Sequence, residues 1–313
     1  MHQIARALPE TEAWFTPYYG NAVERWFVKV GLAEHTIAGR RLRERCLAYL
    51  ERAELAIDCD AERGGYDLCV SCSDVVVQDN VRAPMVLVQE GILDREGVMW
   101  PIISRFPHAL PRWLAGTAAT GLSLRYERFC VASEGYRELF VRRGVPPERL
   151  VTTGIPNFDD CERYRSNAFP HRNYVLVCTS DTRETLKIDR RGAFVRRALR
   201  LAGTRQLIFK LHPNEKGDRS EREIRAIAPH ALVYRDGPTE EMIANCDVLV
   251  TQYSSTAFVG LALGKEVHSY FSEEKLRSWM PVQNRSAAKN IARVCRGVLS
   301  RPRRTTATRG ALA

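Results

Sequence analysis

Five short apolar runs, separated from one another by helical patterns, constrain the fold of the second half of this chain. The runs are Tyr174–Cys178, Leu207–Leu211, Ala231–Tyr234, Asp247–Thr251 and Glu266–Tyr270. The helical patterns lie at Arg190–Leu201, Ser220–Ala228, Thr239–Asn245 and Thr256–Leu263. Runs that are apolar throughout are typical of strands buried on both faces. Their alternation with helices predicts an α/β fold with a doubly wound parallel sheet.

The first half of the chain is similar in kind but less regular. Strands are expected at Ala13–Thr16, Tyr66–Ser71, Met85–Gln89, Phe129–Ala132 and Leu150–Thr153, and helices at Ala22–Val30 and His35–Ile57. The chain opens in a helical pattern at Ile4–Leu8, whereas a Rossmann-like unit normally opens with a buried strand. Either that strand is dispensable or translation starts upstream of Met1, and we favour the second interpretation.

The length of 313 residues accommodates two α/β domains of about 150 residues each. We predict an N-terminal Rossmann-like domain at 1–165, a C-terminal one at 166–300 and a basic, disordered tail at 301–313. The turn at Gly154–Asp159 leads into the connection between the domains. A helix at Ala287–Leu299 closes the second domain.

Composition narrows the class of protein. No stretch approaches the roughly 18 to 20 uninterrupted apolar residues of a membrane span, and the N-terminus lacks the apolar core of a signal peptide, so we expect a cytoplasmic protein. The net charge is +10, of which the tail after Ser300 supplies four arginines and no acid, which leaves +6 for the rest. No nucleic-acid-binding motif accompanies this charge. A basic run at Arg40–Arg45 lies on an expected helix. A solvated face is one interpretation of this run, and attraction to anionic lipid at the inner face of the membrane or to an anionic acceptor is the other.

Two short patterns bear on metal binding. Cys69 and Cys72 have the spacing of a redox or zinc pair, but Cys69 lies in the expected strand Tyr66–Ser71 and the sequence has no second pair of this spacing. The nine cysteines as a set indicate reduced core residues. Asp58–Asp60 fits a short metal-binding pattern but follows a long basic helix, far from the expected strand ends. We therefore predict neither a metal nor a cofactor.

Polar residues follow two of the predicted strands in the second half. His212–Asn214 comes directly after one strand and Tyr253–Thr256 after another. Because ligands bind beyond the carboxyl ends of strands in open α/β sheets, both segments are expected at one site. An imidazole at the first and paired hydroxyls opening a helix at the second suit an anionic leaving group, since a helix N-terminus offers free N–H donors.

Three short motifs give the chain a resemblance to known families. Gln89–Gly91, His212–Pro213 and Ser254–Ser255 resemble the motifs of bacterial sialyl- and Kdo-type capsule glycosyltransferases of the GT-B fold, whose first motif is two acidic residues and then glycine. Tyr253–Ser255 is also similar to CDP-glycerol glycerophosphotransferases, and His212–Asn214 to UDP-GlcNAc 2-epimerases. The resemblance implies a GT-B-like architecture in which two Rossmann-like, doubly wound domains face a cleft.

The resemblance also implies a metal-independent transfer of a sugar from a nucleotide-sugar donor. Such a reaction needs a base for the acceptor hydroxyl and a group that neutralises the departing phosphate. We expect Glu90 to be the base, with Gly91 giving the substrate room. Asp94 is the alternative base. Gln89 stands where the motif that the chain resembles has the first of its two acids. The other interpretation of Glu90 is an ordinary carboxylate in a loop. We expect His212 to stabilise the charge on the leaving oxygen.

The donor-binding candidates surround the same strand ends. Hydroxyls and cations after the strand at Tyr174–Cys178 suit a diphosphate or a carboxylated sugar, although ion pairing of Arg183 with Asp181 and Glu184 is the alternative. Besides contacting the donor phosphate, Ser254 and Ser255 could cap the helix expected at Thr256–Leu263. Glu240 or Glu241 is expected near the ribose. The full set is Thr179, Ser180, Arg183, Lys187, Lys210, Asn214, Glu240, Tyr253, Ser254, Ser255 and Thr256.

The segment Met99–Leu114 is the candidate acceptor side. Its three prolines, two tryptophans and basic residues follow no strand period, which predicts a loop, and a buried irregular helix is the alternative. Aromatic and basic side chains together suit a sugar-stacking surface or the interface of an anionic membrane. The acceptor-binding candidates are Gly91, Asp94, Trp100 and Arg105.

Four functions remain open from the sequence. We favour a glycosyltransferase that moves a sugar from a nucleotide-sugar donor to a cell-surface glycan or a lipid-linked acceptor, with peripheral membrane association and no nucleic-acid partner. A nucleotide-sugar 2-epimerase needs several acids around the sugar, and only His212 has an obvious counterpart. A CDP-glycerol glycerophosphotransferase is less well matched because Gln252 replaces the usual aspartate before Tyr253–Ser255. A binding protein of the same fold is the fourth.

Overall fold

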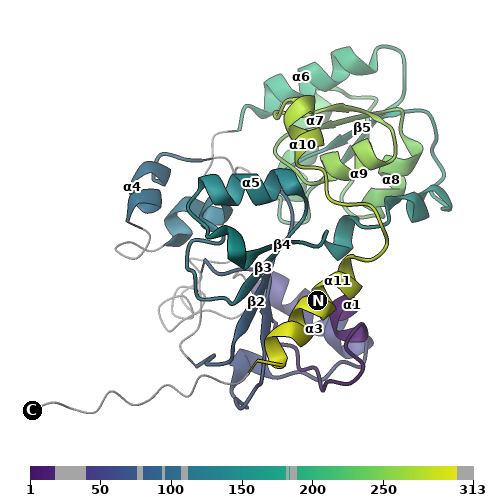
Figure 1. Cartoon of the computed structure of the whole chain (residues 1–313). Helices are drawn as coiled ribbons and strands as arrows, with labels where there is room; N and C mark the ends of the chain where they lie inside the picture. Colours follow the sequence, from purple (N-terminus) through teal and green to yellow (C-terminus); the bar gives the residue numbers. More distant parts are fainter. Residues whose placement is uncertain are drawn as a thin grey trace, which may run out of the picture.

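Two parallel β-sheets form the framework of the protein (Figure 1). The computed structural model describes residues 1–17, 40–75, 80–93, 96–106, 112–180, 183 and 189–301, with the side chains of 40–42 and 113 left aside. The first sheet has the strand order β1-β2-β3-β4. Its strands are β1 (Cys69–Ser71), β2 (Met85–Val88), β3 (Arg128–Val131) and β4 (Leu150–Thr152).

The second sheet has the strand order β7-β6-β5-β8-β9. Its strands are β5 (Val175–Cys178), β6 (Leu207–Lys210), β7 (Leu232–Tyr234), β8 (Val248–Thr251) and β9 (Glu266–His268). The order reverses on either side of β5, which pairs with β6 through Val177 and Phe209 and with β8 through Val177 and Val250. Such a reversal is the place where open α/β sheets bind their ligands, beyond the carboxyl ends of the strands.

Helices cover both faces of the second sheet. Successive residues of a strand face opposite sides. Val177 accordingly lies in one apolar cluster with Phe194, and Leu176 lies in another with Phe258.

The α-helices of the described residues are α1 (His2–Arg6), α3 (Arg40–Arg52), α4 (Trp100–Arg105), α5 (Glu134–Arg142), α6 (Arg191–Ala202), α7 (Gly217–Ile227), α8 (Thr239–Asn245), α9 (Thr256–Ala262), α10 (Glu273–Ser278) and α11 (Ala287–Leu299). Short 3-10 helices lie at η1 (Cys59–Ala61), η2 (Arg112–Ala119), η3 (Pro147–Arg149), η4 (Pro156–Phe158) and η5 (Cys161–Arg165).

The predicted fold class, α/β with two parallel Rossmann-like units, is confirmed. All five strands predicted for the second half are present, with bounds that differ from the prediction by at most two residues. The division of the chain at residue 165 stays a prediction. None of the helices in the described part of the chain has the length and apolar character needed to cross a bilayer.

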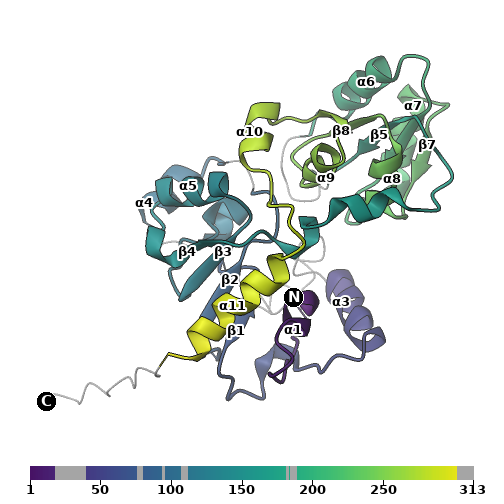
Figure 2. The ribbon, with the colours of Figure 1, turned by 45° about the vertical axis from the view of Figure 1, so that its right-hand side comes forward.

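The last helix returns to the first sheet. Figure 2 shows α11 running beside β2 and α1, and its residues Ile291 and Cys295 are buried in the same apolar cluster as Leu87 of β2. The start of α11 is held by Asp159, whose carboxylate accepts hydrogen bonds from the backbone N–H groups of Asn284 (3.0 Å) and Ala287 (2.8 Å). A segment that follows the second sheet thus completes the core of the first.

Two predictions for the first half need correction, and a third is not tested. Ala13–Thr16 does not form a strand, and Phe15 makes only an isolated parallel bridge with Ile57. The helix expected at His35–Ile57 ends at Arg52, because Glu54 adopts a left-handed conformation with φ of 52°. The helix expected at Ala22–Val30 lies outside the described residues.

The predicted loop at Met99–Leu114 also needs correction. Trp100–Arg105 forms α4, and η2 begins at Arg112. Pro101 lies in the first turn of α4, where the missing N–H of proline is no loss, since the first N–H groups of a helix have no partner within the helix. Pro101 therefore does not keep Trp100–Arg105 out of a helix.

The two units meet at a close contact between α5 and α10 (Figure 2). The ring of Tyr136 stacks on that of Trp279, with 5.2 Å between ring centroids. A Cβ atom on Gly135 would lie 1.9 Å from the backbone oxygen of Ser278. Only glycine lets the two backbones approach this closely.

Replacement of Gly135 by alanine is expected to lower the free energy of unfolding by about 3 kcal/mol, because the added methyl group overlaps the backbone of Ser278. The measurement is urea denaturation followed by circular dichroism. Gly297→Ala is the matched control, since a Cβ there meets nothing within 4 Å and alanine favours the helix by about 0.5 to 1 kcal/mol. Equal stability of the two variants would contradict the contact.

Candidate functional site

The histidine of the His212–Pro213 motif is oriented by the turn after β6. Its backbone N–H donates to the Thr179 hydroxyl (3.1 Å) and to the Glu215 carboxylate (3.1 Å). Its ring Nδ1 accepts a hydrogen bond from the backbone N–H of Asn214 at 3.2 Å. Because an accepting Nδ1 carries no proton, the neutral ring holds its proton on Nε2. The imidazole is half-buried.

A buried carboxylate joins the end of β5 to the end of β6. Glu215, only 7% exposed, accepts hydrogen bonds from the hydroxyls of Thr179 and Ser220 and pairs with the Arg191 guanidinium. A buried charge is costly unless it is both paired and hydrogen-bonded, and Glu215 meets both conditions. The loops after the two strands are thereby fixed to each other.

The same network extends to the end of β8 through Gln252. Its side-chain N–H donates to Asp189 at 2.9 Å, and its side-chain oxygen accepts from the Ser180 hydroxyl. The Arg191 Nε also donates to Asp189, at 2.9 Å. An amide can donate and accept at once, whereas an ionised carboxylate only accepts. These two hydrogen bonds explain why residue 252 is a glutamine, where the CDP-glycerol glycerophosphotransferases that the chain resembles usually have an aspartate.

Arg183 is held by carboxylates, as in the ion-pairing alternative, but with different partners. Its Nη1 lies 2.8 Å from Glu223 and its Nε 3.5 Å from Asp189. The partners named from the sequence, Asp181 and Glu184, lie outside the described residues, as does the donor candidate Lys187. Contact of Arg183 with a donor phosphate stays a prediction.

The paired serines lie at the start of α9. The Ser254 hydroxyl accepts from the Thr256 backbone N–H (3.3 Å) and from the Thr256 hydroxyl (3.0 Å). Ser255 occupies the N-cap position, but within the described structure its hydroxyl makes no capping hydrogen bond. The Tyr253 ring packs edge-on against Phe271, 5.0 Å away between centroids. Ser254 thus orders the turn, and the Ser255 side chain does not act as the predicted cap.

In the first sheet, the Gln89–Gly91 motif follows β2. Gln89 is 2% exposed; its Nε2 donates to the Gly91 oxygen (2.8 Å), and its Oε1 accepts from the Ala132 backbone N–H (2.9 Å). A carboxylate could not make the first of these bonds. The departure from the acid-acid-glycine pattern therefore has a structural reason, and Glu90 is the single carboxylate of the motif.

The Glu90 side chain remains open to solvent, but neighbouring protein atoms reduce its hydration, and this desolvation raises the pKa of its carboxyl. A raised pKa makes a carboxylate a stronger base. Glu90 also lies close enough to Cys72 that its negative charge adds to the desolvation that raises the pKa of that thiol to about 11. Asp94, the alternative base, lies outside the described residues.

The motifs of the two sheets meet at Gly91 and Ser255. A Cβ atom on Gly91 would lie 3.5 Å from the Ser255 Cβ and 3.6 Å from its hydroxyl oxygen. These are ordinary contact distances, so the protein itself does not require glycine at this position. The contact joins Gly91, which follows Glu90 after β2, to the start of α9, which follows β8.

Two predicted donor residues have other surroundings. Lys210 is 5% exposed, and its ammonium donates to the backbone oxygens of Leu211 (2.8 Å) and Arg235 (3.3 Å), on the side of β7. Desolvation lowers the pKa of this ammonium. Glu240 is exposed in the first turn of α8. Donor contacts of either residue stay predictions.

On the acceptor side, the Trp100 ring is covered by a neighbouring cation. The Arg143 guanidinium lies 4.7 Å from its centroid and also pairs with Glu96 at 3.0 Å. Trp100 packs against the core of the first unit, and Arg105 is exposed at the end of α4. One face of the tryptophan is therefore occupied by protein.

Asp58 and Asp60 have protein partners. Asp58 accepts from the Tyr66 hydroxyl at 2.5 Å, and Asp60 pairs with Arg43 at 3.4 Å. Within the described ranges, no group of three or more histidine, cysteine or acidic side chains is arranged to hold a metal ion.

No protein-family model and no curated protein sequence matches the chain. Solved structures do resemble it. The UDP-GlcNAc 2-epimerase of Methanocaldococcus jannaschii, in complex with UDP-GlcNAc and UDP, matches with a TM-score of 0.57 and 12% identity over 94% of this chain and 95% of that one. The Neisseria meningitidis UDP-GlcNAc 2-epimerase bound to UDP-GlcNAc gives 0.49 and 12% over 81% and 80%. The wall teichoic acid polymerase TagF gives 0.36 and 12% over 71% of this chain and 62% of TagF, so the chain spans less than two thirds of that protein.

At 12% identity, the match to the Methanocaldococcus jannaschii epimerase shows the fold. The chain has the GT-B-type arrangement of two Rossmann-like units. This is the architecture that the three motifs implied.

Glu215→Gln is expected to lower the free energy of unfolding by about 3 kcal/mol, because it removes a buried charge opposite Arg191 and brings an amide donor next to other donors. Urea denaturation measures the change. Glu273→Gln, which breaks an exposed pair with Arg277, is the control and should cost less than about 1 kcal/mol. A Glu215 variant as stable as the control would show that the network is not required for the fold.

Proposed function

We propose that the protein is a GT-B-type glycosyltransferase that moves a sugar from a nucleotide-sugar donor to a cell-surface glycan or a lipid-linked acceptor. The observation that carries the proposal is the contact between Gly91 and Ser255. It brings the glycine that follows Glu90 within contact distance of one of the paired serines, which supports a site shared by the first motif and the strand ends of the second sheet. A base and anion-binding donors then lie on the two sides of one site.

In the proposed reaction, Glu90 takes the proton from the acceptor hydroxyl as the acceptor oxygen bonds to the anomeric carbon. The bond from that carbon to the donor phosphate breaks, and its electron pair leaves with the phosphate oxygen. The Nε2–H of His212 and the Ser255 hydroxyl stabilise the resulting charge. This assignment uses the tautomer that the Asn214 contact selects.

The remaining binding roles belong to the same proposal. Thr179 and Ser180 at the end of β5, together with Arg183, border the donor diphosphate. The exposed apolar side chains Val98, Ile102 and Phe106 near Arg105 support an acceptor side that lies against the inner face of the membrane, with the protein in the cytoplasm.

A nucleotide-sugar 2-epimerase is the second candidate. The match over 94% of the chain to an epimerase solved with UDP-GlcNAc and UDP favours it. A 2-epimerase acts by elimination of the nucleotide and re-addition, so it changes the configuration of the sugar without an acceptor, whereas a transferase releases the nucleotide only when an acceptor is present. Product analysis therefore separates the two functions.

We expect one of CMP, UDP, CDP or GDP to raise the melting temperature, because a ligand at 100 times its dissociation constant adds about 2.7 kcal/mol of stability. The corresponding nucleotide sugar should release its nucleotide only with an acceptor glycan.

His212→Ala should abolish turnover without a loss of cooperative unfolding. His230 is an exposed histidine after α7, and His230→Ala should keep full turnover. Isomerised sugar without nucleotide release would favour the epimerase, and full activity of the His212 variant would remove His212 from the mechanism.

The raised pKa of Glu90 gives a pH prediction. The base form is lost as the pH falls through that pKa, so the acidic limb of kcat/KM should lie above the ordinary value for glutamate. Glu90→Gln should abolish this limb and lower kcat far more than donor affinity. Glu138→Gln, on the exposed side of α5, should leave the profile unchanged. An acidic limb that survives in the Glu90 variant would assign the base to another group.

A further inference from the structure

Helix α6 carries arginines and no acid on the side that it turns to solvent. Arg196 and Arg200 are exposed, Arg197 is half-buried, and the exposed Arg190 occupies the N-cap position. No aspartate or glutamate occurs from residue 190 to residue 214. Figures 1 and 2 both show α6 at the outer edge of the second unit. The positive charge of this helix therefore faces the surroundings of the protein.

The three arginines within the helix share one face. Successive residues of an α-helix are about 100° apart around the axis, which places Arg196, Arg200 and Arg197 within an arc of about 100°. The exposed Ala193 falls inside this arc, and the buried Ala198 lies on the opposite side of the helix. The three arginine side chains thus leave α6 in similar directions.

The protein supplies no counter-charge to this face. Within the described residues, Arg190, Arg196, Arg197 and Arg200 form no ion pair. The acids of α7, the helix that packs against α6, have other partners. Their pairs are Asp218–Arg235, Glu221–Arg225 and Glu223–Arg183. The α6 face, which we define as these four arginines, therefore keeps its full positive charge.

Other exposed helices pair their arginines within the helix. On α5, Arg137 lies 3.9 Å from Glu134, and on α10, Arg277 lies 2.6 Å from Glu273. On α6 the neighbours at these spacings are other arginines, and like charges three or four residues apart on a helix repel each other. An external anion that meets several of these arginines at once would remove the repulsion.

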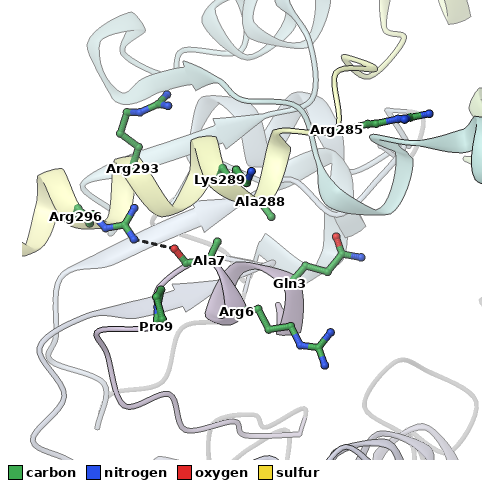
Figure 3. A pocket seen from close by; sticks show the side chains of 9 residues that line it. All are labelled: Gln3, Arg6, Ala7, Pro9, Arg285, Ala288, Lys289, Arg293 and Arg296. Carbon is green, nitrogen blue, oxygen red and sulfur yellow. Dashed lines mark hydrogen bonds between the residues drawn. The ribbon is translucent and has the colours of Figure 1, made fainter.

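A second group of exposed cations without ion pairs in the described structure does not form such a face. Arg6 lies on α1, and Lys289 and Arg293 lie on α11. In Figure 3, Arg6 and Arg293 point away from each other, on opposite sides of the two helices. These three residues therefore provide a matched control, because they carry the same charge without a common surface.

The shape and composition of the α6 face narrow the kind of anion. A helix of 12 residues is about 18 Å long, so the face can lie along a flat surface that carries many charges. Leu199, which is 40% exposed, lies beside the face. Phe194 is the single aromatic residue of α6 and is buried, so bases of a single-stranded nucleic acid would find no ring on which to stack. Four or more basic residues on an amphipathic helix are typical of surfaces that bind anionic phospholipids.

We propose that the α6 face binds the headgroups of an anionic phospholipid bilayer. Its guanidinium groups would donate hydrogen bonds to the headgroup phosphates, which they match in a two-point geometry. The contact lies on the second unit, and it uses neither the strand-end site nor the acceptor surface proposed near α4. It is therefore independent of the reaction that the protein catalyses.

The test is co-sedimentation of the full chain with phosphatidylcholine vesicles that contain or lack phosphatidylglycerol. Binding is expected only to vesicles with phosphatidylglycerol, and it should fall as the ionic strength rises, because salt screens the attraction. The triple variant Arg196→Gln, Arg197→Gln, Arg200→Gln should lower the partition coefficient about a hundredfold, since each arginine near an anionic membrane contributes about fivefold.

Two further variants separate the α6 face from total charge and from stability. The triple variant Arg6→Gln, Lys289→Gln, Arg293→Gln removes the same charge from sites without a common surface and should keep vesicle binding. Ala193→Glu places a carboxylate in the α6 face, within the first turn of the helix, where an acid stabilises the helix. It should weaken vesicle binding without lowering the melting temperature.

Three results would overturn the proposal. Equal weakening in both triple variants would show a general charge effect, and unchanged binding of the α6 variant would show that lipid meets another surface. Tighter binding of a duplex oligonucleotide than of anionic vesicles, dependent on the same three arginines, would make nucleic acid the partner. None of these results bears on nucleotide-sugar turnover, which is measured with a soluble acceptor and without vesicles.

Discussion

The buried pairing of Glu215 with Arg191 is the interaction on which the geometry of the candidate site depends. Parallel strands supply hydrogen bonds along their length, but nothing in a sheet fixes the loops beyond the strand ends. Here a desolvated carboxylate does so, because it must be surrounded by donors. Its donors come from the loop after β5, the turn after β6 and the start of α6. The orientation of His212 is therefore a consequence of burying one charge.

The sequence predicts the second sheet well because its three central strands, β5, β6 and β8, are buried on both faces. Such strands are apolar throughout, and their limits are marked by the polar residues that follow, as at His212 after β6. Helix α11, which has a strong amphipathic pattern, is predicted to the residue. The first half is harder. Whether Ala13–Thr16 becomes a strand depends on partners distant in the sequence, and its only bridge is at Phe15 and Ile57.

Parts of the site follow from the sequence and others do not. Strand ends can be located from apolar runs, so Glu90, His212 and Ser255 could be named as candidates. The direction of a side chain cannot be read in the same way. The Lys210 side chain lies toward β7 because its ammonium donates to two backbone oxygens there. The Gln89 side chain forms hydrogen bonds to the backbone after β2 and after β3, and an acid could not form both of them. The sequence does not identify Arg191 as a buried residue, because an arginine at the start of a helix is ordinarily exposed. Arg191 is buried because the fold brings two carboxylates, Asp189 and Glu215, to its guanidinium.

The two units touch through small side chains and backbone at several places. Gly91 faces Ser255, Gly135 faces the backbone of Ser278, and Asp159 holds the start of α11. Contacts of this kind tolerate little change in spacing, because interiors are close-packed and a methyl group at Gly135 has nowhere to go. The separation between Glu90 and the strand ends of the second sheet is therefore set by residues outside the site, on α5, α10 and α11. Under the proposed function, a base on one unit and anion donors on the other act on one substrate only if that separation is held, and these contacts hold it.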